Sequence, residues 1–167
     1  MQANEEGHLR YEHLVQINDP MFPLLDPLSR DQVWDGLVMR AYAPEQFVLG
    51  LETSTVEELP AQSADKRLAR TLDFGGFQVR DVVSLHEREA VVTDVAAGPD
   101  WPKSRLTISI EEPETEQLFL RFLYEWDEDR ADTELDSMTL TIRERAYFAA
   151  DLDTVAKIRQ LATGPAE

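Results

Sequence analysis

The tetrapeptide Phe74-Gly75-Gly76-Phe77 separates two runs in which apolar and polar residues alternate, at positions 68–74 and 77–85. Glycine adopts the positive φ angles that a two-residue hairpin turn requires. The stretch therefore predicts two antiparallel strands joined by a tight turn. If the loop has two residues, Arg70 lies opposite Asp81 in the register of the two strands.

Arg70 and Asp81 share one face of this hairpin with apolar side chains, because alternate residues of a strand point to the same side. That face also carries Leu68, Leu72 and Val79. Burying an ion pair is costly, so a pair on an apolar face needs a reason, and a polar spot inside a cavity is one. The other interpretation, a cross-strand ion pair on the solvent face of the sheet, stays open.

The chain has 167 residues, of which 43% are hydrophobic, and this length and composition are typical of one globular domain. We expect a single domain over residues 1–167, with its core at about residues 8–163. Cysteine is absent, which excludes disulfides and thiolate catalysis. The polar segment 1–12 does not resemble a signal peptide, and no apolar run approaches the ~20 residues of a membrane span. A cytoplasmic protein is therefore expected.

The formal net charge of −17 argues against binding to nucleic acids, whose phosphates would be repelled. It argues equally against anionic membrane surfaces. Solubility through surface charge explains this acidity better than a specific cationic partner does. The sequence leaves the oligomeric state open, and a homodimer is one option.

Two short helices are predicted upstream of the hairpin. Residues 8–17 alternate loosely and predict a first strand, and the proline-rich segment 18–27 predicts a loop. Ser29 is placed to cap a helix, and Gln32 is placed to complete a capping box. Pro44 ends this helix and can open a second, shorter one.

Further β-type segments follow the helices, and consecutive strands joined by short turns pair antiparallel. They are residues 48–59, the two hairpin strands, 90–95, 105–110, 117–126 and, after an acidic loop at 127–136, a last strand with Met138, Leu140 and Ile142. Apolar residues at 3/4 spacing predict a C-terminal helix at about 147–161.

This order of elements predicts an α+β, helix-grip fold. It consists of a seven-stranded, curved antiparallel sheet wrapped around a long C-terminal helix, with two short helices after the first strand. A strongly curved sheet around a single helix leaves a gap, and we expect that gap to be a ligand cavity.

Four motifs add a more specific resemblance, which extends from about Tyr11 to Leu161. They are Leu28–Leu37, Phe74–Phe77, Phe122–Glu125 and Ala146-Tyr147. With these motifs the chain resembles the START and Bet v 1-like (SRPBCC) superfamily. Within it, the chain resembles a family named after protein L of the acetylaranotin biosynthesis cluster, once classed as a domain of unknown function. The resemblance implies a pocketed fold of the polyketide-cyclase and lipid-transfer type and no particular activity.

The candidate ligand-binding residues come from the inner face of the sheet and from the C-terminal helix. They are Arg70, Leu72, Phe74, Val79, Asp81, Phe122, Tyr124, Trp126, Met138, Leu140, Phe148 and Leu152. For catalysis, Asp81 is the candidate base, and Arg70 or Tyr124 would stabilise an oxyanion or enolate.

The favoured function is the binding of a hydrophobic or amphipathic, for example aromatic, small molecule in the cavity. The alternative is an enzyme of the polyketide cyclase or dehydratase kind, and a second alternative is a partner-binding adaptor. No cofactor is predicted. His8, His13 and His86 show no metal spacing, and His13 is expected to be a satisfied histidine of the sheet. The acidic run from Asp127 lacks the glycine and the distal ligand of a calcium loop, so no metal site is predicted.

Overall fold

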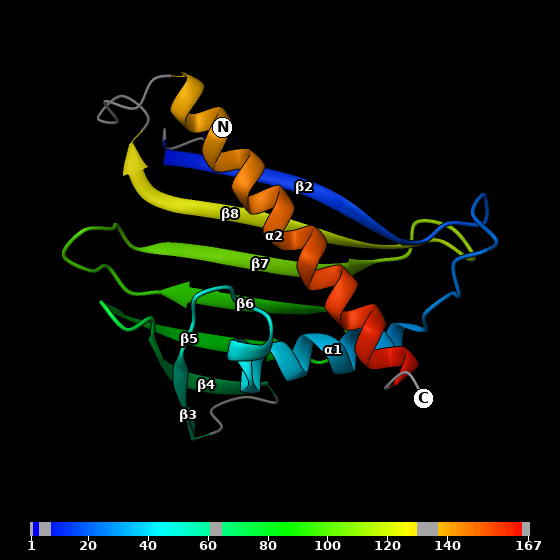
Figure 1. Cartoon of the computed structure of the whole chain (residues 1–167), viewed down its shortest axis with the longest axis horizontal. Helices are drawn as coiled ribbons and strands as arrows, with labels where there is room; N and C mark the ends of the chain where they lie inside the picture. The colour runs from blue at the N-terminus through cyan, green and yellow to red at the C-terminus, as the bar shows by residue number, and fades with distance from the viewer. Residues whose placement is uncertain (1, 4–7, 61–64, 130–136, 165–167) are drawn as a thin grey trace.

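The computed structural model describes residues 2–3, 8–60, 65–129 and 137–164, which form one antiparallel sheet with two α-helices on one of its faces (Figure 1). The strand order is β1-β2-β8-β7-β6-β5-β4-β3. The elements are β1 (Gln2–Ala3), β2 (His8–Asn18), α1 (Arg30–Tyr42), the 3-10 helix η1 (Pro44–Gln46), β3 (Thr53–Glu58), β4 (Lys66–Asp73), β5 (Gln78–His86), β6 (Ala90–Val95), β7 (Ser104–Glu111), β8 (Leu118–Asp129) and α2 (Ser137–Thr163). The predicted α+β architecture is confirmed, with β2–β8 as the seven longer strands and β1 as a two-residue addition.

Strands β4 and β5 form the predicted hairpin in the predicted register. Leu72 pairs with Val79, and Arg70 pairs with Asp81. Gly75 has a φ of +90°, whereas the φ of Gly76 is not positive. The turn therefore requires glycine at its first central position.

Helix α1 begins where the sequence predicts. The Ser29 hydroxyl oxygen accepts a hydrogen bond from the backbone N–H of Gln32, whose side chain accepts one from the backbone N–H of Ser29. Pro44 then opens η1. Gly36 allows α1 to pack closely on α2, because a Cβ at this position would lie 2.8 Å from the side chain of Ile158.

The predicted last strand is wrong. Met138, Leu140 and Ile142 lie in the first turns of α2, which starts earlier than expected. Apolar residues at alternate positions over so short a stretch fit a strand or a helix equally well. Strand β8 continues to Asp129, so the acidic segment begins within a strand, and the expected loop residues 130–136 lie outside the described residues.

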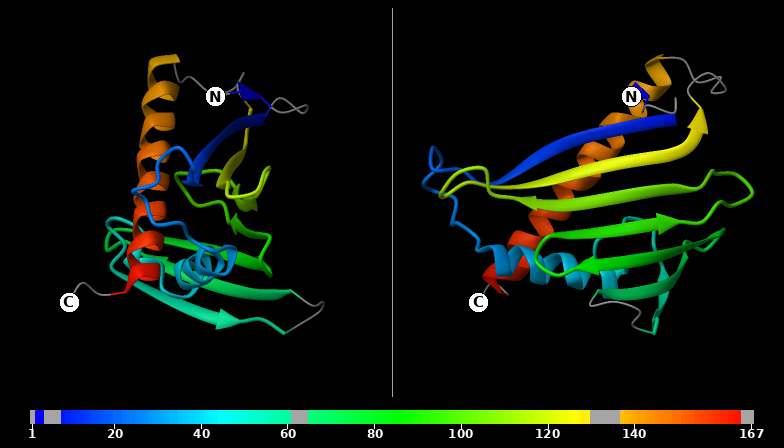
Figure 2. Two further views of the ribbon diagram at one scale, coloured as in Figure 1. Left: turned by 90° about the vertical axis from the view of Figure 1, so that its right-hand side faces the viewer. Right: turned by 180° about the vertical axis from the view of Figure 1, so that it is seen from behind.

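Helices α1 and α2 lie on the same side of the curved sheet, and α2 runs obliquely across the strands (Figure 2). The main core fills the space between helices and sheet, with fully buried Val33, Leu68, Phe122 and Ile158 among its members. A second cluster, at one end of β2 and β8, consists of Leu9, Trp126 and Leu140. No helix in the described part of the chain is long and apolar enough to cross a membrane.

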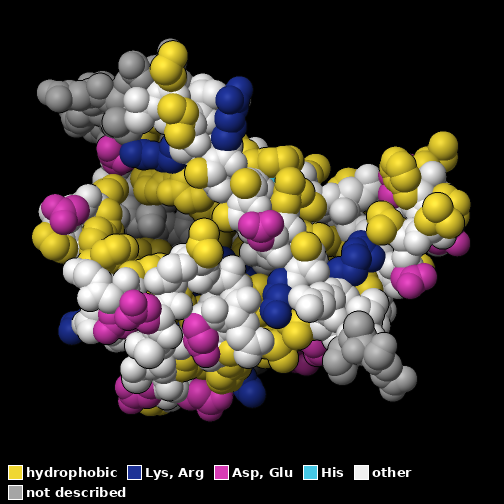
Figure 3. Space-filling view, in the orientation of Figure 1, with side chains coloured by type: hydrophobic (Ala, Val, Ile, Leu, Met, Phe, Trp, Pro, Cys, Tyr) yellow, Lys and Arg dark blue, Asp and Glu magenta, His cyan; other side chains and the backbone are white. Residues whose placement is uncertain are grey.

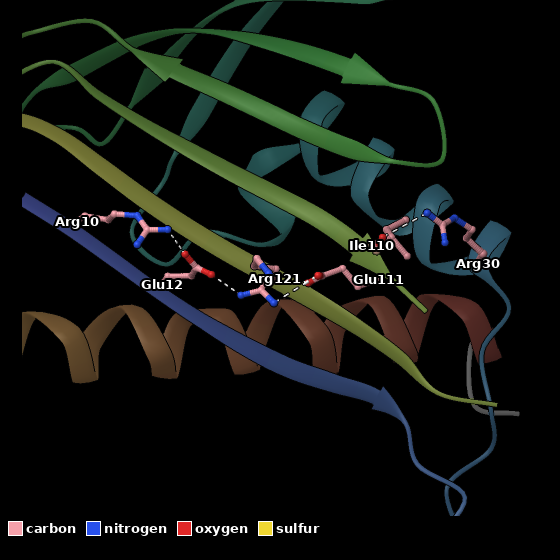
Figure 4. Close-up of polar contacts among 6 residues, drawn as sticks. All are labelled: Arg10, Glu12, Arg30, Ile110, Glu111 and Arg121. Atoms are coloured by element: carbon pink, nitrogen blue, oxygen red, sulfur yellow. Dashed lines mark hydrogen bonds and ion pairs between the residues drawn. The ribbon is translucent and has the colours of Figure 1, made fainter. Parts of the chain in front are cut away.

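The opposite face of the sheet carries charged pairs that join neighbouring strands (Figure 4). Glu12 contacts both Arg10 and Arg121, and Arg121 Nε donates to Glu111 Oε2 at 2.7 Å. Arg30, at the start of α1, donates to a backbone carbonyl of β7. Arg121 therefore lies on the face of the sheet away from the helices, and the apolar side of the sheet faces the helices.

Candidate functional site

A cavity of about 220 Å³ lies between the inner face of the sheet, the end of α1 and α2. Figure 3 shows a hollow beside α2 that is bordered by hydrophobic side chains. The cavity is mostly apolar, with a small number of charged and hydroxyl groups. Its lining consists of Arg40, Pro44, Val48, Arg70, Leu72, Phe74, Val79, Asp81, Thr93, Val95, Ser104, Arg105, Leu106, Tyr124, Trp126 and Tyr147.

An outer chamber of about 370 Å³ adjoins this cavity and shares Val79, Trp126 and Tyr147 with it. Trp101, from the loop between β6 and β7, and Arg143, from α2, line the outer chamber only. The inner cavity and the outer chamber are therefore adjacent.

Arg70 and Asp81 face the cavity and not the solvent. They are 6% and 5% exposed, and Arg70 donates to the two carboxylate oxygens of Asp81, from Nε at 2.8 Å and from Nη2 at 2.7 Å. Arg70 Nη1 donates to the carbonyl oxygen of Ala41 in α1 at 2.9 Å. The interpretation of this pair as a solvent-face ion pair is therefore wrong. Because both oxygens of Asp81 are engaged by a guanidinium, this carboxylate is poorly suited to act as a base.

Arg40, in the last turn of α1, is another cation of the cavity, and no carboxylate of the described residues lies within ion-pair distance of it. Its Nε is buried and has no hydrogen-bond partner. Burial lowers the pKa of the Arg40 guanidinium, and the nearby Arg70 lowers it further, although Tyr124 and Asp151 act in the opposite direction. An arginine stays protonated in proteins all the same, so this group is a partly buried cation.

Tyr124, Asp151 and His13 form a hydrogen-bonded chain that leads away from the cavity. The Tyr124 hydroxyl donates to Asp151 Oδ1 at 2.7 Å, and His13 Nε2 lies 2.6 Å from Asp151 Oδ2. The His13 ring stacks between Tyr11 and Phe122, with ring centroids 5.3 Å from each, and His13 Nδ1 is buried without a partner. Of these three residues, only Tyr124 lines the cavity.

Burial changes the pKa values of Asp151 and Tyr124. Burial raises the pKa of Asp151, while the hydrogen bonds from Tyr124 and His13 act against that rise. Burial, followed by the adjacent Asp151, raises the pKa of Tyr124 well above its usual range. Tyr124 is therefore neutral at physiological pH, and Asp151 is a more basic carboxylate than an exposed one.

Most of the candidate residues on the sheet line the cavity. Seven of the twelve do so: Arg70, Leu72, Phe74, Val79, Asp81, Tyr124 and Trp126. Phe122 is fully buried against His13, and Leu140 is buried with Leu9 and Trp126, so these two belong to the core.

The three remaining candidates, all on α2, lie outside the cavity. Met138, Leu152 and Phe148 are 71%, 43% and 41% exposed, so the expectation that they face the ligand cavity is corrected. Met138 lies in the first turn of α2 and not on the expected strand. The Phe148 ring packs on His13 of β2, outside the cavity, with the ring centroids 4.9 Å apart. Tyr147 contributes to the lining from this helix instead.

Sequence reasoning missed Arg40 and Asp151. Arg40 follows Val33 by two helical turns, so the helical spacing that identifies the buried side of α1 also includes Arg40. Asp151 gave no such signal, because its role depends on how α2 packs on β8. In the described part of the chain, no three His, Asp or Glu side chains are grouped in a way that could hold a metal ion.

Several solved structures share this fold. The di-domain ARO/CYC StfQ from the steffimycin biosynthetic pathway matches with a TM-score of 0.61 at 9% identity over 90% of this chain and 49% of that chain, so the present chain spans about half its length. Ara h 8.0201 matches with a TM-score of 0.59 at 7% identity over 91% of this chain and 98% of that chain. The Zhui aromatase/cyclase from Streptomyces sp. R1128 matches with a TM-score of 0.57 at 12% identity over 93% of each chain. At these identities the likeness shows the helix-grip fold alone.

The sequence itself identifies the family. No curated protein matches the chain. The family model described as acetylaranotin biosynthesis cluster protein L matches residues 15–164, which cover both α-helices, the C-terminal end of β2 and every later strand. The resemblance found in the sequence motifs is thereby confirmed, and the chain belongs to the acetylaranotin biosynthesis cluster protein L family.

Proposed function

We propose that this protein binds a small hydrophobic or amphipathic molecule in the cavity between the sheet and the helices. The observation that supports this most directly is the lining: Leu72, Val79 and Leu106 supply apolar walls, and a few charged and hydroxyl groups complete them. Ligand sites in proteins typically combine a mostly apolar concave wall with a few placed polar groups.

The size of the cavity limits the ligand. At about 220 Å³, the inner cavity lies below the ~300–1,000 Å³ that is usual for drug-sized ligands. A ligand with about two fused rings, or a longer one that reaches the outer chamber beside Trp101, fits this space best. Burial of its apolar surface would supply most of the affinity, at roughly 25 cal/mol per Å².

Native mass spectrometry of the purified protein tests this proposal first, because a tightly held ligand adds a defined mass that is lost on denaturation. Calorimetric titration with 2-naphthamide, a neutral bicyclic probe, then measures uptake by the ligand-free protein. Val79→Trp fills the cavity and should abolish uptake. Val82→Trp, on the opposite face of the same strand, should leave it unchanged. A ligand-free protein that takes up no bicyclic probe would contradict the proposal.

A second candidate function, an enzyme acting on a carbonyl compound, is favoured by the hydrogen-bonded chain behind Tyr124. The Tyr124 hydroxyl oxygen can accept a proton from a substrate carbon while its own proton passes to Asp151. The substrate would become an enolate, and the Arg40 guanidinium, which lines the same cavity, would stabilise its negative oxygen. Two of the proteins with this fold, StfQ and Zhui, are aromatase/cyclases by name.

Hydrogen–deuterium exchange separates the two functions. If these hydrogen-bonded residues are catalytic, the protein should accelerate exchange of the carbon-bound protons next to the carbonyl of phenylacetone in D₂O. NMR measures the rate of this exchange. Tyr124→Phe should reduce the rate to the background of the buffer, and Tyr42→Phe, which removes an exposed hydroxyl elsewhere, should not. Exchange at the background rate with the wild-type protein would leave binding as the only candidate.

A further inference from the structure

We propose that Arg40 is the residue that recognises the ligand, and that the ligand is an organic anion: a carboxylate carried by a small aromatic or apolar body. This inference rests on the proposed binding function and names its ligand class. It differs from the sequence-based expectation, in which Arg70 and Asp81 form the polar spot of the cavity.

Three arginines line the cavity, and their contacts distinguish their roles. Arg105 is paired with Asp94, to which its Nε donates at 2.6 Å. Arg70 uses Nε and Nη2 to hold Asp81, and uses Nη1 to hold the carbonyl of Ala41. That guanidinium is already neutralised and fixed in place. Arg40 has no carboxylate within ion-pair distance in the described part of the chain, and its buried Nε donates to nothing.

The other buried carboxylate does not supply the missing partner. One carboxylate oxygen of Asp151 accepts a hydrogen bond from the Tyr124 hydroxyl, and the other is hydrogen-bonded to His13. The cavity wall therefore contains one cation whose charge no direct contact balances. Burying an unpaired charge costs several kcal/mol, so a site of this kind favours an anion that restores the balance.

A structural role at the end of the helix is the competing explanation, because a cation in the last turn of a helix interacts favourably with its dipole. The terminal carbonyl of Ala41, however, is already bonded by Arg70, and the backbone N–H of Ala43 bonds to Met39. Arg40 makes no hydrogen bond of this capping kind, and its side chain lines the cavity.

Carboxylate chemistry follows from the shape of the donor. A guanidinium offers parallel N–H groups that match the two oxygens of a carboxylate. Thr93 and Ser104 line the same cavity and can donate a further hydrogen bond from a hydroxyl group. The rest of the ligand would pack on Leu72, Val79 and Leu106.

A matched pair of probes tests the inference. 2-Naphthoate and 2-naphthamide have nearly the same shape and differ in charge. Calorimetry should show that the wild-type protein binds the naphthoate at least about tenfold more tightly, the factor expected from hydrogen bonds to a charged group. Arg40→Met should remove this preference while binding of the naphthamide persists. Arg80→Met, which removes an exposed arginine from the opposite face of β5, should keep the preference. Val79→Trp should block both probes, which places the binding in the cavity.

The outcomes separate this inference from the proposed function. If the wild-type protein binds both probes equally, or if Arg40→Met retains the preference for naphthoate, the role of Arg40 is refuted and the binding function stands. If neither probe binds, both proposals are contradicted. Loss of both probes in a folded Arg40→Met variant would also refute the inference, because it would show that Arg40 shapes the cavity and does not select its ligand.

Discussion

At the scale of single residues, the charge of Arg40 should lower the stability of the ligand-free protein by a measurable amount. Arg40→Met keeps much of the side-chain volume and removes a partly buried charge whose Nε has no hydrogen-bond partner. We expect this substitution to raise the free energy of unfolding by about 1–3 kcal/mol, since replacing buried charges with apolar groups of similar size is often stabilising. Urea denaturation of the ligand-free proteins measures the change.

The matched control for this stability measurement is Arg80→Met, because Arg80 is exposed on the other face of the sheet. Its effect should stay within about 0.5 kcal/mol, as for most surface substitutions. A clear loss of stability in Arg40→Met alone would show that Arg40 is held by favourable contacts, contrary to its description as an unpaired cation.

Tyr124→Phe should destabilise the protein more at high pH than at low pH. Burial raises the pKa of Asp151, so the contribution of that carboxyl itself is complete below its unfolded-state pKa and is lost as the pH rises through its folded-state pKa. The hydrogen bond from Tyr124 favours the charged form, so its contribution has the opposite sign of pH dependence. We expect a loss of about 1.5–3 kcal/mol at pH 8, the range for bonds to charged groups, and a smaller loss as the pH falls.

Urea denaturation of wild type and Tyr124→Phe over a pH series from 8 to 5 measures this difference. Tyr42→Phe is the control, because the Tyr42 hydroxyl bonds to the exposed Glu58 at 2.7 Å. Its removal should cost little at every pH. A loss for Tyr124→Phe that does not change across the series would show that the bond does not depend on the charge of Asp151.

The limits of sequence reasoning are also visible at this scale. Turn chemistry determined the register of the hairpin, so the pairing of Arg70 with Asp81 could be predicted from Gly75 and Gly76. The helical spacing of α1 could have predicted that Arg40 lies on the buried side of this helix. A cation in the last turn of a helix, however, is already explained by its favourable interaction with the helix dipole. Asp151 could not be found, because only tertiary packing brings it to Tyr124.

At the scale of elements, the hairpin offers a prediction with an internal control. Gly75→Ala forces a side chain into a φ of +90°, which should cost about 1–2 kcal/mol in the free energy of unfolding. At Gly76, φ is not positive and an added Cβ meets nothing within 4 Å, so Gly76→Ala should be neutral or slightly stabilising. Thermal and urea denaturation compare the two variants. Equal losses would mean that the turn does not have the described backbone conformation.

The elements that sequence patterns predicted best are those with a local signal. The capping box at Ser29 and the glycine turn each depend on a few adjacent residues, and both are present. The start of α2, in contrast, depends on residues that are farther apart in the sequence. Met138 and Ile142 are exposed on this helix, so their alternation with Leu140 did not report a buried strand face.

At the scale of the whole molecule, the two faces of the sheet have different roles. Its outer face carries cross-strand ion pairs such as Arg121 with Glu111, and its inner face carries the core and the cavity. Exposed pairs of this kind are worth about 1 kcal/mol or less each. The stability of the fold therefore depends on the inner face, the same face that leaves space for a ligand.

The net charge of −17 makes a prediction for the molecule as a whole. Like charges spread over the surface repel one another more in the compact state than in the unfolded chain. Raising the ionic strength from about 0.01 M to 0.15 M shortens the screening length from about 30 Å to about 8 Å, which weakens this repulsion. We therefore expect the melting temperature to rise with added NaCl over this range.

The surface ion pairs oppose this effect, because salt also weakens the attraction between Arg121 and its partners Glu12 and Glu111. Since each exposed pair contributes little, the long-range repulsion of 17 excess negative charges should dominate. Differential scanning calorimetry at pH 8 in NaCl and in KCl measures the change, and equal responses to the two salts would exclude specific sodium binding. A melting temperature that falls with salt would show that local ion pairs contribute more to the stability of this fold than the repulsion between its excess charges costs it.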